Sequence, residues 1–165
     1  MGAFGTIAGA IRANLATVPD IGVVLATAPL PPLVEDWAEF IDTFTTVIGG
    51  LRQVRAWTVA FAGSRVIPDS TRRGFGSHKE LREVRYVVRG YLGRHFPDSE
   101  ATFRDLIEEV IVKLDLDEGF GGTVLEHDDV EVDLPDNADA VLLGDVVCHY
   151  CEITVVTRVE LTLTA

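Results

Sequence analysis

The chain has 165 residues, of which 47% are hydrophobic, and its formal net charge at pH 7 is −12. This length and apolar content predict a single domain, residues 1–165, that buries its own core without disulfides or a metal. No apolar run approaches the ~18–20 residues of a membrane-spanning helix, and the negative net charge disfavours non-specific binding to nucleic acid.

The charge is divided unevenly along the chain. Residues 51–94 hold ten Lys/Arg and three Asp/Glu, a net +7, whereas residues 95–165 hold three Lys/Arg and eighteen Asp/Glu, a net −15. Charge patterns report on association rather than on fold. We therefore expect copies of this chain to associate through oppositely charged regions.

The first elements are predicted from apolar spacing. Residues 3–17 carry apolar side chains at helical intervals, and the run 23–25 has the length of a short strand. An amphipathic helix is expected over 34–48, ended by Gly49-Gly50. The apolar stripe of this helix would consist of Trp37, Phe40, Ile41, Phe44 and Ile48.

A long hairpin is predicted in the middle of the chain. Residues 51–67 and 81–92 alternate in the manner of strands, and the polar segment 68–78 joins them. In the second strand, Val84, Tyr86, Val88, Gly90 and Leu92 should face one way.

The last third predicts one helix and two strand regions. Residues 99–116 follow the helical period, the acidic segment 126–139 contains one alternating run, and residues 146–163 form a long final strand. The predicted order is α-β-α-β-β-α-β-β. Consecutive strands favour hairpins, so we expect an α+β fold with a mostly antiparallel sheet and helices packed on it.

The sequence contains only weak matches to catalytic and metal-binding motifs. Cys148 and Cys151 form a C-x-x-C, but strand alternation puts the two thiols on opposite faces of the sheet. The acidic run after Asp115 lacks the glycine that a calcium loop requires, and the segment 126–129 is more typical of a polar turn or edge strand than of a cation site. We therefore predict no catalytic residue, no cofactor and no metal site.

The arginine-rich hairpin has three interpretations: contact with nucleic acid, a solvated face, or a subunit interface. The net charge and the absence of interleaved exposed aromatic residues argue against a dedicated nucleic-acid binder. A head-to-tail contact between the hairpin and the acidic segment 126–139 of a neighbour would form a ring if its rotation closes. The residues predicted for this interface are Arg72, Arg73, Arg82, Arg85, Arg89, Asp128, Asp129, Glu131 and Asp133.

Segments along nearly the whole chain carry a family resemblance. They are the N-terminal helix, the Pro-rich passage into 34–48, the strands around 55–59 and 84–91, the helix 102–115 and the segment 143–153. In these segments the chain resembles the tail terminator (tail completion) proteins of long-tailed bacteriophages and related particles.

The resemblance implies a structural protein rather than an enzyme. It implies a sheet flanked by helices and a homohexameric ring that caps the tail tube, ends tube polymerisation and meets a head-side connector or stopper protein. DNA would pass through the lumen, no membrane would be involved, and the protein would lie at the neck of the virion after assembly in the host cytoplasm. Because the acids outnumber the bases, we also expect some of them to line the lumen, where like charge keeps DNA from sticking.

Two alternatives remain open at this point. One is another neck component, such as a head-completion or stopper protein. The other is a small metal-dependent enzyme or binding domain that uses the Cys, His and Asp residues.

Overall fold

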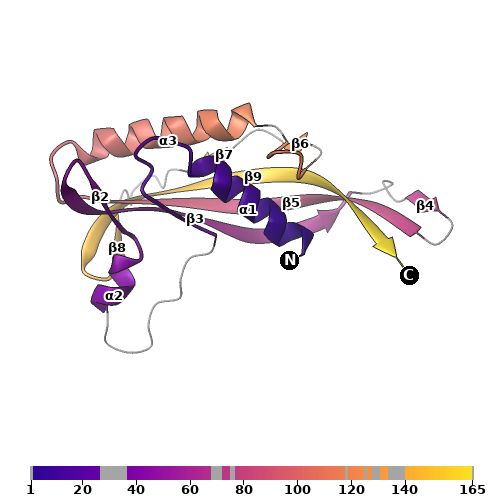
Figure 1. Ribbon diagram of the computed structural model, residues 1–165, viewed down its shortest axis with the longest axis horizontal. Helices are drawn as coiled ribbons and strands as arrows, with labels where there is room; N and C mark the ends of the chain where they lie inside the picture. Colours follow the sequence, from indigo (N-terminus) through magenta and orange to yellow (C-terminus); the bar gives the residue numbers. More distant parts are fainter. Residues whose placement is uncertain are drawn as a thin grey trace.

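The computed structural model describes residues 2–26, 37–67, 72–74, 77–117, 119–124, 126–127, 131–133 and 140–164. These ranges contain three helices and nine strands (Figure 1). The helices are α1 (Ala3–Leu15), α2 (Trp37–Asp42) and α3 (Ser99–Leu116). The strands are β1 (Val23–Leu25), β2 (Thr45–Ile48), β3 (Leu51–Val66), β4 (Arg72–Gly74), β5 (Ser77–Gly93), β6 (Glu126–His127), β7 (Glu131–Asp133), β8 (Val141–Leu143) and β9 (Val146–Thr164).

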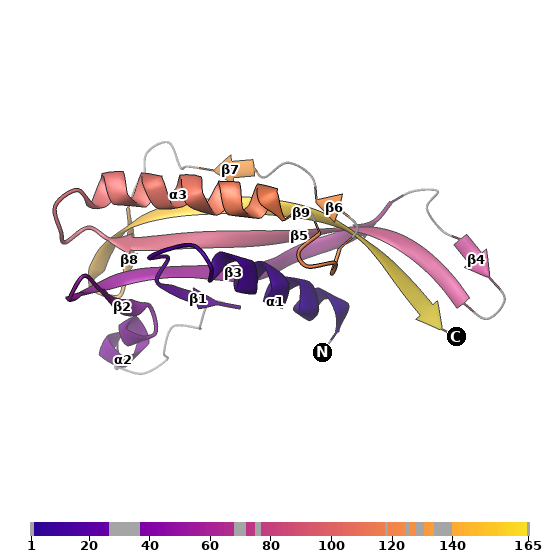
Figure 2. The ribbon, with the colours of Figure 1, turned by 45° about the horizontal axis from the view of Figure 1, so that its top comes forward.

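The strands belong to one sheet built around three long members. Its main order is β1-β3-β5-β9-β6, with β2 also paired to β3, β4 to β5, and β7 and β8 to β9. Among the described strands only the β1–β3 pair is parallel. The predicted α+β class, the mostly antiparallel sheet and the long β3–β5 hairpin are therefore confirmed (Figure 2).

The main core lies between the sheet and two helices. The side chains of Val84, Tyr86 and Val88 all point to the face that α1 and α3 cover, and all three are buried there. This face also holds the fully buried Trp57. The alternation predicted for the second hairpin strand is confirmed, because period-2 geometry puts every other side chain on the covered face.

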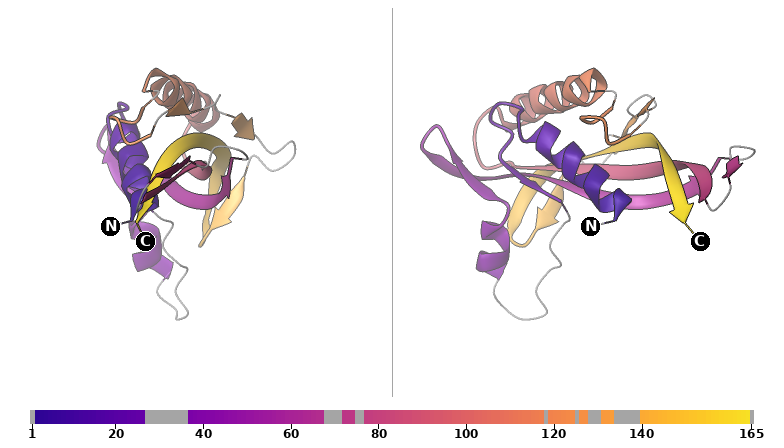
Figure 3. Two further views of the ribbon diagram at one scale, coloured as in Figure 1. Left: turned by 90° about the vertical axis from the view of Figure 1, so that its right-hand side faces the viewer. Right: turned by 45° about the vertical axis from the view of Figure 1, so that its right-hand side comes forward.

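A smaller core lies on the opposite face of the sheet, beside α2 (Figure 3). It contains Phe44, Val54, Ala56 and Cys148, with partly buried side chains of α2 against them. Because this second cluster covers only one end of the sheet, much of the rest of that face is exposed or only partly buried.

The prediction of one helix over 34–48 is wrong at its C-terminal end. Helix α2 ends at Asp42, and residues 45–48 form β2, which pairs antiparallel with β3. Gly49 and Gly50 both have positive φ angles, 58° and 81°, as a tight two-residue hairpin turn requires. The two glycines therefore turn a hairpin instead of capping a helix, and residues 34–36 lie outside the described ranges.

None of the described helices is both long and apolar enough to cross a membrane.

Candidate assembly surface

The three long strands extend beyond the helices at one end of the molecule and form an arm (Figures 1 and 2). We define the arm as residues 64–67, 72–74, 77–85 and 158–164. These residues include seven Arg/Lys and three Asp/Glu. A β-bulge in β3 between Phe61 and Gly63 precedes the arm, and bulges increase the local twist of a strand pair.

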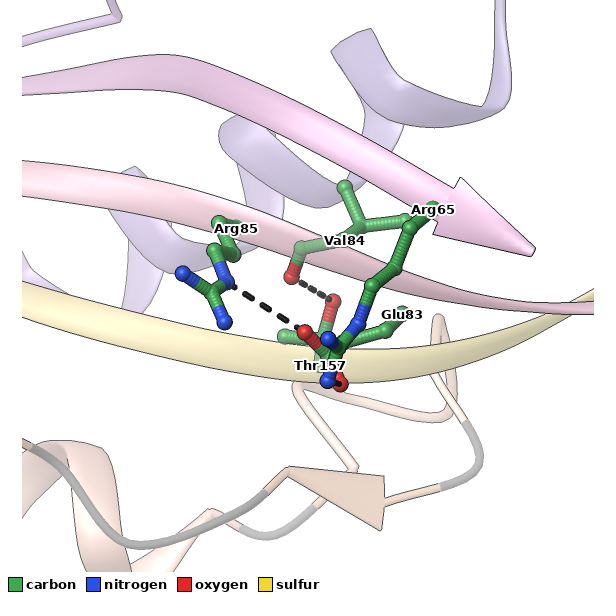
Figure 4. Close-up of polar contacts among 5 residues, drawn as sticks. All are labelled: Arg65, Glu83, Val84, Arg85 and Thr157. Atoms are coloured by element: carbon green, nitrogen blue, oxygen red, sulfur yellow. Dashed lines mark hydrogen bonds and ion pairs between the residues drawn. The ribbon is translucent and has the colours of Figure 1, made fainter. Parts of the chain in front are cut away.

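The centre of the arm is a buried carboxylate. Glu83 accepts a hydrogen bond from Nη2 of Arg65 at 2.6 Å and another from Nε of Arg85 at 3.3 Å (Figure 4). The bond from Arg65 is the main reason why the pKa of Glu83 is below its ordinary value, although burial acts in the opposite direction. Beside this cluster, Thr157 donates a hydrogen bond to the carbonyl of Val84 at 3.2 Å and so ties β9 to β5.

Two further cations among the described side chains of the arm are also ion-paired within the chain. Arg82 pairs with Glu80 and donates to the hydroxyl of Ser64 at 3.2 Å. Lys79 lies 2.5 Å from Glu160. The Lys79–Glu160 pair is exposed, and exposed ion pairs contribute only ~0–1 kcal/mol each, so Lys79 can exchange its partner at small cost.

Arg89 lies in a polar cluster on the face opposite α1 and α3. Its Nε donates to Glu152 at 3.0 Å, and the hydroxyl of Tyr150 donates to the same carboxylate. The hydrogen bond from Tyr150 is the main cause of the lowered pKa of Glu152. Burial of Tyr150 is the main cause that raises the pKa of its hydroxyl.

The predicted acidic partner lies in the same sheet as the hairpin. In the pairing register Glu152 is opposite Arg89 on one side and Asp133 on the other, and Glu131 is opposite Thr154. The structure thus brings Arg89 and Asp133 two strands apart within one subunit.

Six of the predicted interface residues lie wholly or partly outside the described atoms. The backbones of Arg72 and Arg73 lie in β4 at the end of the arm, but their side chains lie outside the described atoms. The same holds for the side chains of Glu131 and Asp133 in β7, and the prediction for Asp128 and Asp129 falls outside the described residues.

A second charged surface, which was not predicted from the sequence, is a groove between α3 and the segment that follows α1. The groove has a volume of about 600 Å³, and its walls include Asp105, Glu108 and Glu109 of α3. Val112 and Leu116 continue the same helix face and are 56% and 77% exposed. The helical period could have located this outward face of α3, but not the segment that completes the groove.

The two cysteines are structural. Both are fully buried, and they belong to the two different cores, so the prediction that they lie on opposite faces is confirmed. Burial raises the pKa of each thiol to about 12, which suppresses the reactive thiolate. Within the described ranges, no group of three or more His, Cys, Asp or Glu side chains is placed to hold a metal ion.

The acidic end of α3 has a local structural use. The carboxylate of Asp117 accepts hydrogen bonds from Nδ2 of Asn14 at 2.9 Å and from the backbone N–H of Gly121 at 3.1 Å. These bonds tie the turn after α3 to α1.

Comparisons with known proteins bear on the fold. No protein-family model matches the sequence, and no curated protein matches it. A solved structure with a similar fold is the sheath/tube terminator of an extracellular contractile injection system, PVC, determined by cryo-electron microscopy in its extended state. The TM-score is 0.50 at 14% identity, and the match covers 98% of this chain but 57% of that one. The resemblance to terminator proteins is therefore confirmed at the level of the fold.

Proposed function

We propose that this chain is a structural tail terminator, a protein that forms a ring on the end of a tail tube and stops tube polymerisation. The observation that carries the proposal is the fold match to a sheath/tube terminator over 98% of the chain. The sequence resemblance to tail terminators of long-tailed phages supports the same role.

The separated charges of the chain support ring formation. The arm is basic, whereas the face of α3 that lines the groove is acidic, so the two surfaces are complementary but different. Contacts between different surfaces of identical subunits are heterologous, and they close into rings when the rotation allows. Six copies, as the resemblance implies, would surround a lumen wide enough for DNA.

In this proposal the predicted arginines of the hairpin contact the acidic region of the next subunit. The ring lies between the tube protein on one side and a head-side connector or stopper on the other. The protein needs no catalytic residue and no cofactor for this role. It acts at the top of the tail of an assembled particle.

The test is assembly with the tube protein of the same particle. We expect native mass spectrometry to show a closed ring, and electron microscopy to show tubes capped at one end and limited in length when the protein is added during polymerisation. A protein that stays monomeric both alone and with the tube protein would overturn the proposal. Binding to the connector without binding to the tube would also overturn it, in favour of another neck component.

A further inference from the structure

The groove along α3 presents acidic and apolar groups together. Asp105 and Glu108 form no ion pair with any described side chain. Lys113, on the same helix, is the cation that lines the groove. Val112 and Leu116 expose apolar side chains beside these carboxylates. A partner that fits this surface must itself carry both cations and apolar side chains, because an apolar partner would leave the carboxylates desolvated and unpaired.

A buried arginine partly neutralises one carboxylate of the groove wall, Glu109. Arg55 is 5% exposed, and its charge is attracted by Asp20 and Glu109. Burial is the main cause of its lowered pKa. The lining of the groove keeps an excess of carboxylates, since Asp105, Glu108 and Glu109 outnumber Lys113.

The arm has the matching composition. Its seven Arg/Lys exceed its three Asp/Glu, and the side chains of Arg65 and Arg85 are 69% and 54% exposed. Val66 at the end of β3 is 39% exposed. Most of the arm extends past α1 and α3 (Figure 2), and only its base, which includes Val84 and Val159, is buried in the core beneath these helices.

We infer that the arm of one subunit docks into the α1–α3 groove of the next copy. The occupant is a second copy of this chain because the two surfaces are complementary. The outer part of the arm is basic and exposes apolar groups, whereas the groove is acidic and also exposes apolar groups. The arm cannot fill the groove of its own subunit, because the continuous strands β5 and β9 carry it away from α3 (Figures 1 and 3). This inference rests on the self-association in the proposed function and names the surfaces that would make it.

A charge exchange tests the contact. In the arm variant, Arg72→Glu and Arg73→Glu reverse two charges at the end of β4. In the groove variant, Asp105→Lys and Glu108→Lys reverse two charges on α3. We expect each pair to raise the protein concentration at half-assembly by about tenfold or more, since reversal replaces attraction by repulsion. The quadruple variant should return to within about threefold of the parent.

Asp115→Lys is the matched control for the groove. Asp115 is an exposed residue of α3 that does not line the groove, so its reversal should leave assembly unchanged. Analytical ultracentrifugation would give the assembly midpoints, and circular dichroism would show that each variant is folded.

Cross-linking provides a second readout that does not depend on charge. Val66→Cys in one chain and Val112→Cys in another should give a covalent heterodimer with a short bismaleimide, while each variant alone should give none. Chains that carry both substitutions should give a ladder of oligomers. The native thiols add little background because both are fully buried.

The outcomes separate the two proposals. The arm–groove contact is wrong if the parent assembles and neither charge reversal weakens its assembly, or if the quadruple variant does not regain assembly. These outcomes do not contradict ring formation itself. If the groove reversal weakens binding to the tube protein and not self-association, the groove belongs to the tube and the inference is also wrong. A parent that stays monomeric with its tube protein overturns both proposals.

Discussion

Gly90 is the residue at which β5 passes closest to the ring of Trp57. A Cβ at position 90 would lie 2.8 Å from Cη2 and Cζ3 of Trp57 and 3.0 Å from Sγ of Cys151. Both neighbours are fully buried and have little room to move. We expect Gly90→Ala to lower the free energy of unfolding by about 1–3 kcal/mol, because it overpacks the core. Urea denaturation at constant pH would measure the change.

Gly9 provides the matched control. It lies within α1, and a Cβ there would have no atom within 4 Å. Gly9→Ala should therefore raise the free energy of unfolding by about 0.5–1 kcal/mol through helix propensity. Equal losses at the two positions would show that packing against Trp57 is not the cause.

Glu83 should make stability depend on pH in the acid range. Its pKa in the folded protein is below the ordinary carboxyl value of 4.5, so the folded state binds fewer protons than the unfolded state. The stability that Glu83 contributes is therefore complete above pH 4.5 and is lost as the pH falls from there toward the folded-state pKa. Thermal melts between neutral and strongly acidic pH would show the loss.

Glu83→Gln should remove this acid-range loss. At pH 7 we expect it to lower the free energy of unfolding by about 1–2 kcal/mol, because Arg65 and Arg85 lose a charged acceptor but stay solvated. Glu108→Gln, which alters an exposed carboxylate with no described ion-pair partner, is the control and should change neither quantity. A pH profile that is identical in the parent and in Glu83→Gln would contradict the assignment.

At the scale of elements, α3 has two functional faces. Leu114 is fully buried against the sheet, whereas Leu116, two residues later, is 77% exposed. We expect Leu114→Ala to cost about 2–5 kcal/mol of stability, as core truncations do. Leu116→Ala should change stability by no more than about 0.5 kcal/mol and should weaken self-association instead. The prediction fails if Leu116→Ala unfolds the monomer or leaves the assembly midpoint unchanged.

The segment 37–50 shows where sequence periodicity misleads. Its apolar residues fit a helix, but residues 45–48 are two threonines, a valine and an isoleucine, all β-branched and suited to a strand. The pair Gly49-Gly50 then matches a hairpin turn. Pairing with β3 decided between the helix and the strand. A pairing partner elsewhere in the chain cannot be read from the apolar period of one short segment.

The long elements were predictable because their own patterns are strong. Helix α3 has the predicted bounds, and β3 and β9 differ from their predicted ranges by one residue. The polar contacts were not predictable in the same way. The pairs of Arg65 with Glu83 and of Arg89 with Glu152 depend on strand register. For the first pair, the bulge after Phe61 shifts the β3–β5 register by one residue. The charge count along the sequence predicts the basic hairpin. It does not predict that carboxylates of the same chain pair with the arginines of this hairpin.

At the scale of the whole molecule, self-association should depend on the charge of the hairpin. We expect Arg82→Glu with Arg85→Glu to weaken assembly by about tenfold and to leave a folded monomer, because Arg65 still pairs with Glu83 while the reversed charges oppose docking at a repeated interface. Raising the salt concentration from about 50 mM to about 500 mM should also weaken self-association of the parent protein. Sedimentation velocity would measure both effects.

Arg12→Glu with Arg104→Glu is the control for this change. Both arginines lie on helices, away from the hairpin, and the substitution alters the net charge equally. If the control weakens assembly as much as the hairpin variant, overall charge and not docking is the cause. Unchanged assembly in the hairpin variant would contradict the charge-docking hypothesis but not the fold similarity.

The place of β9 in the chain has a consequence for biogenesis. β9 is an inner strand of the sheet, paired with β5 on one side and with β6, β7 and β8 on the other, yet a ribosome makes it after the other described strands. Until residues 146–164 emerge, β5 has one unsatisfied edge, and such edges invite aggregation. Closing the sheet also requires contacts across residues 94–145, which slows folding. The nascent chain is therefore vulnerable from the completion of β5 until β9 emerges, and no subunit can offer a complete arm to a neighbour before β9 is in place.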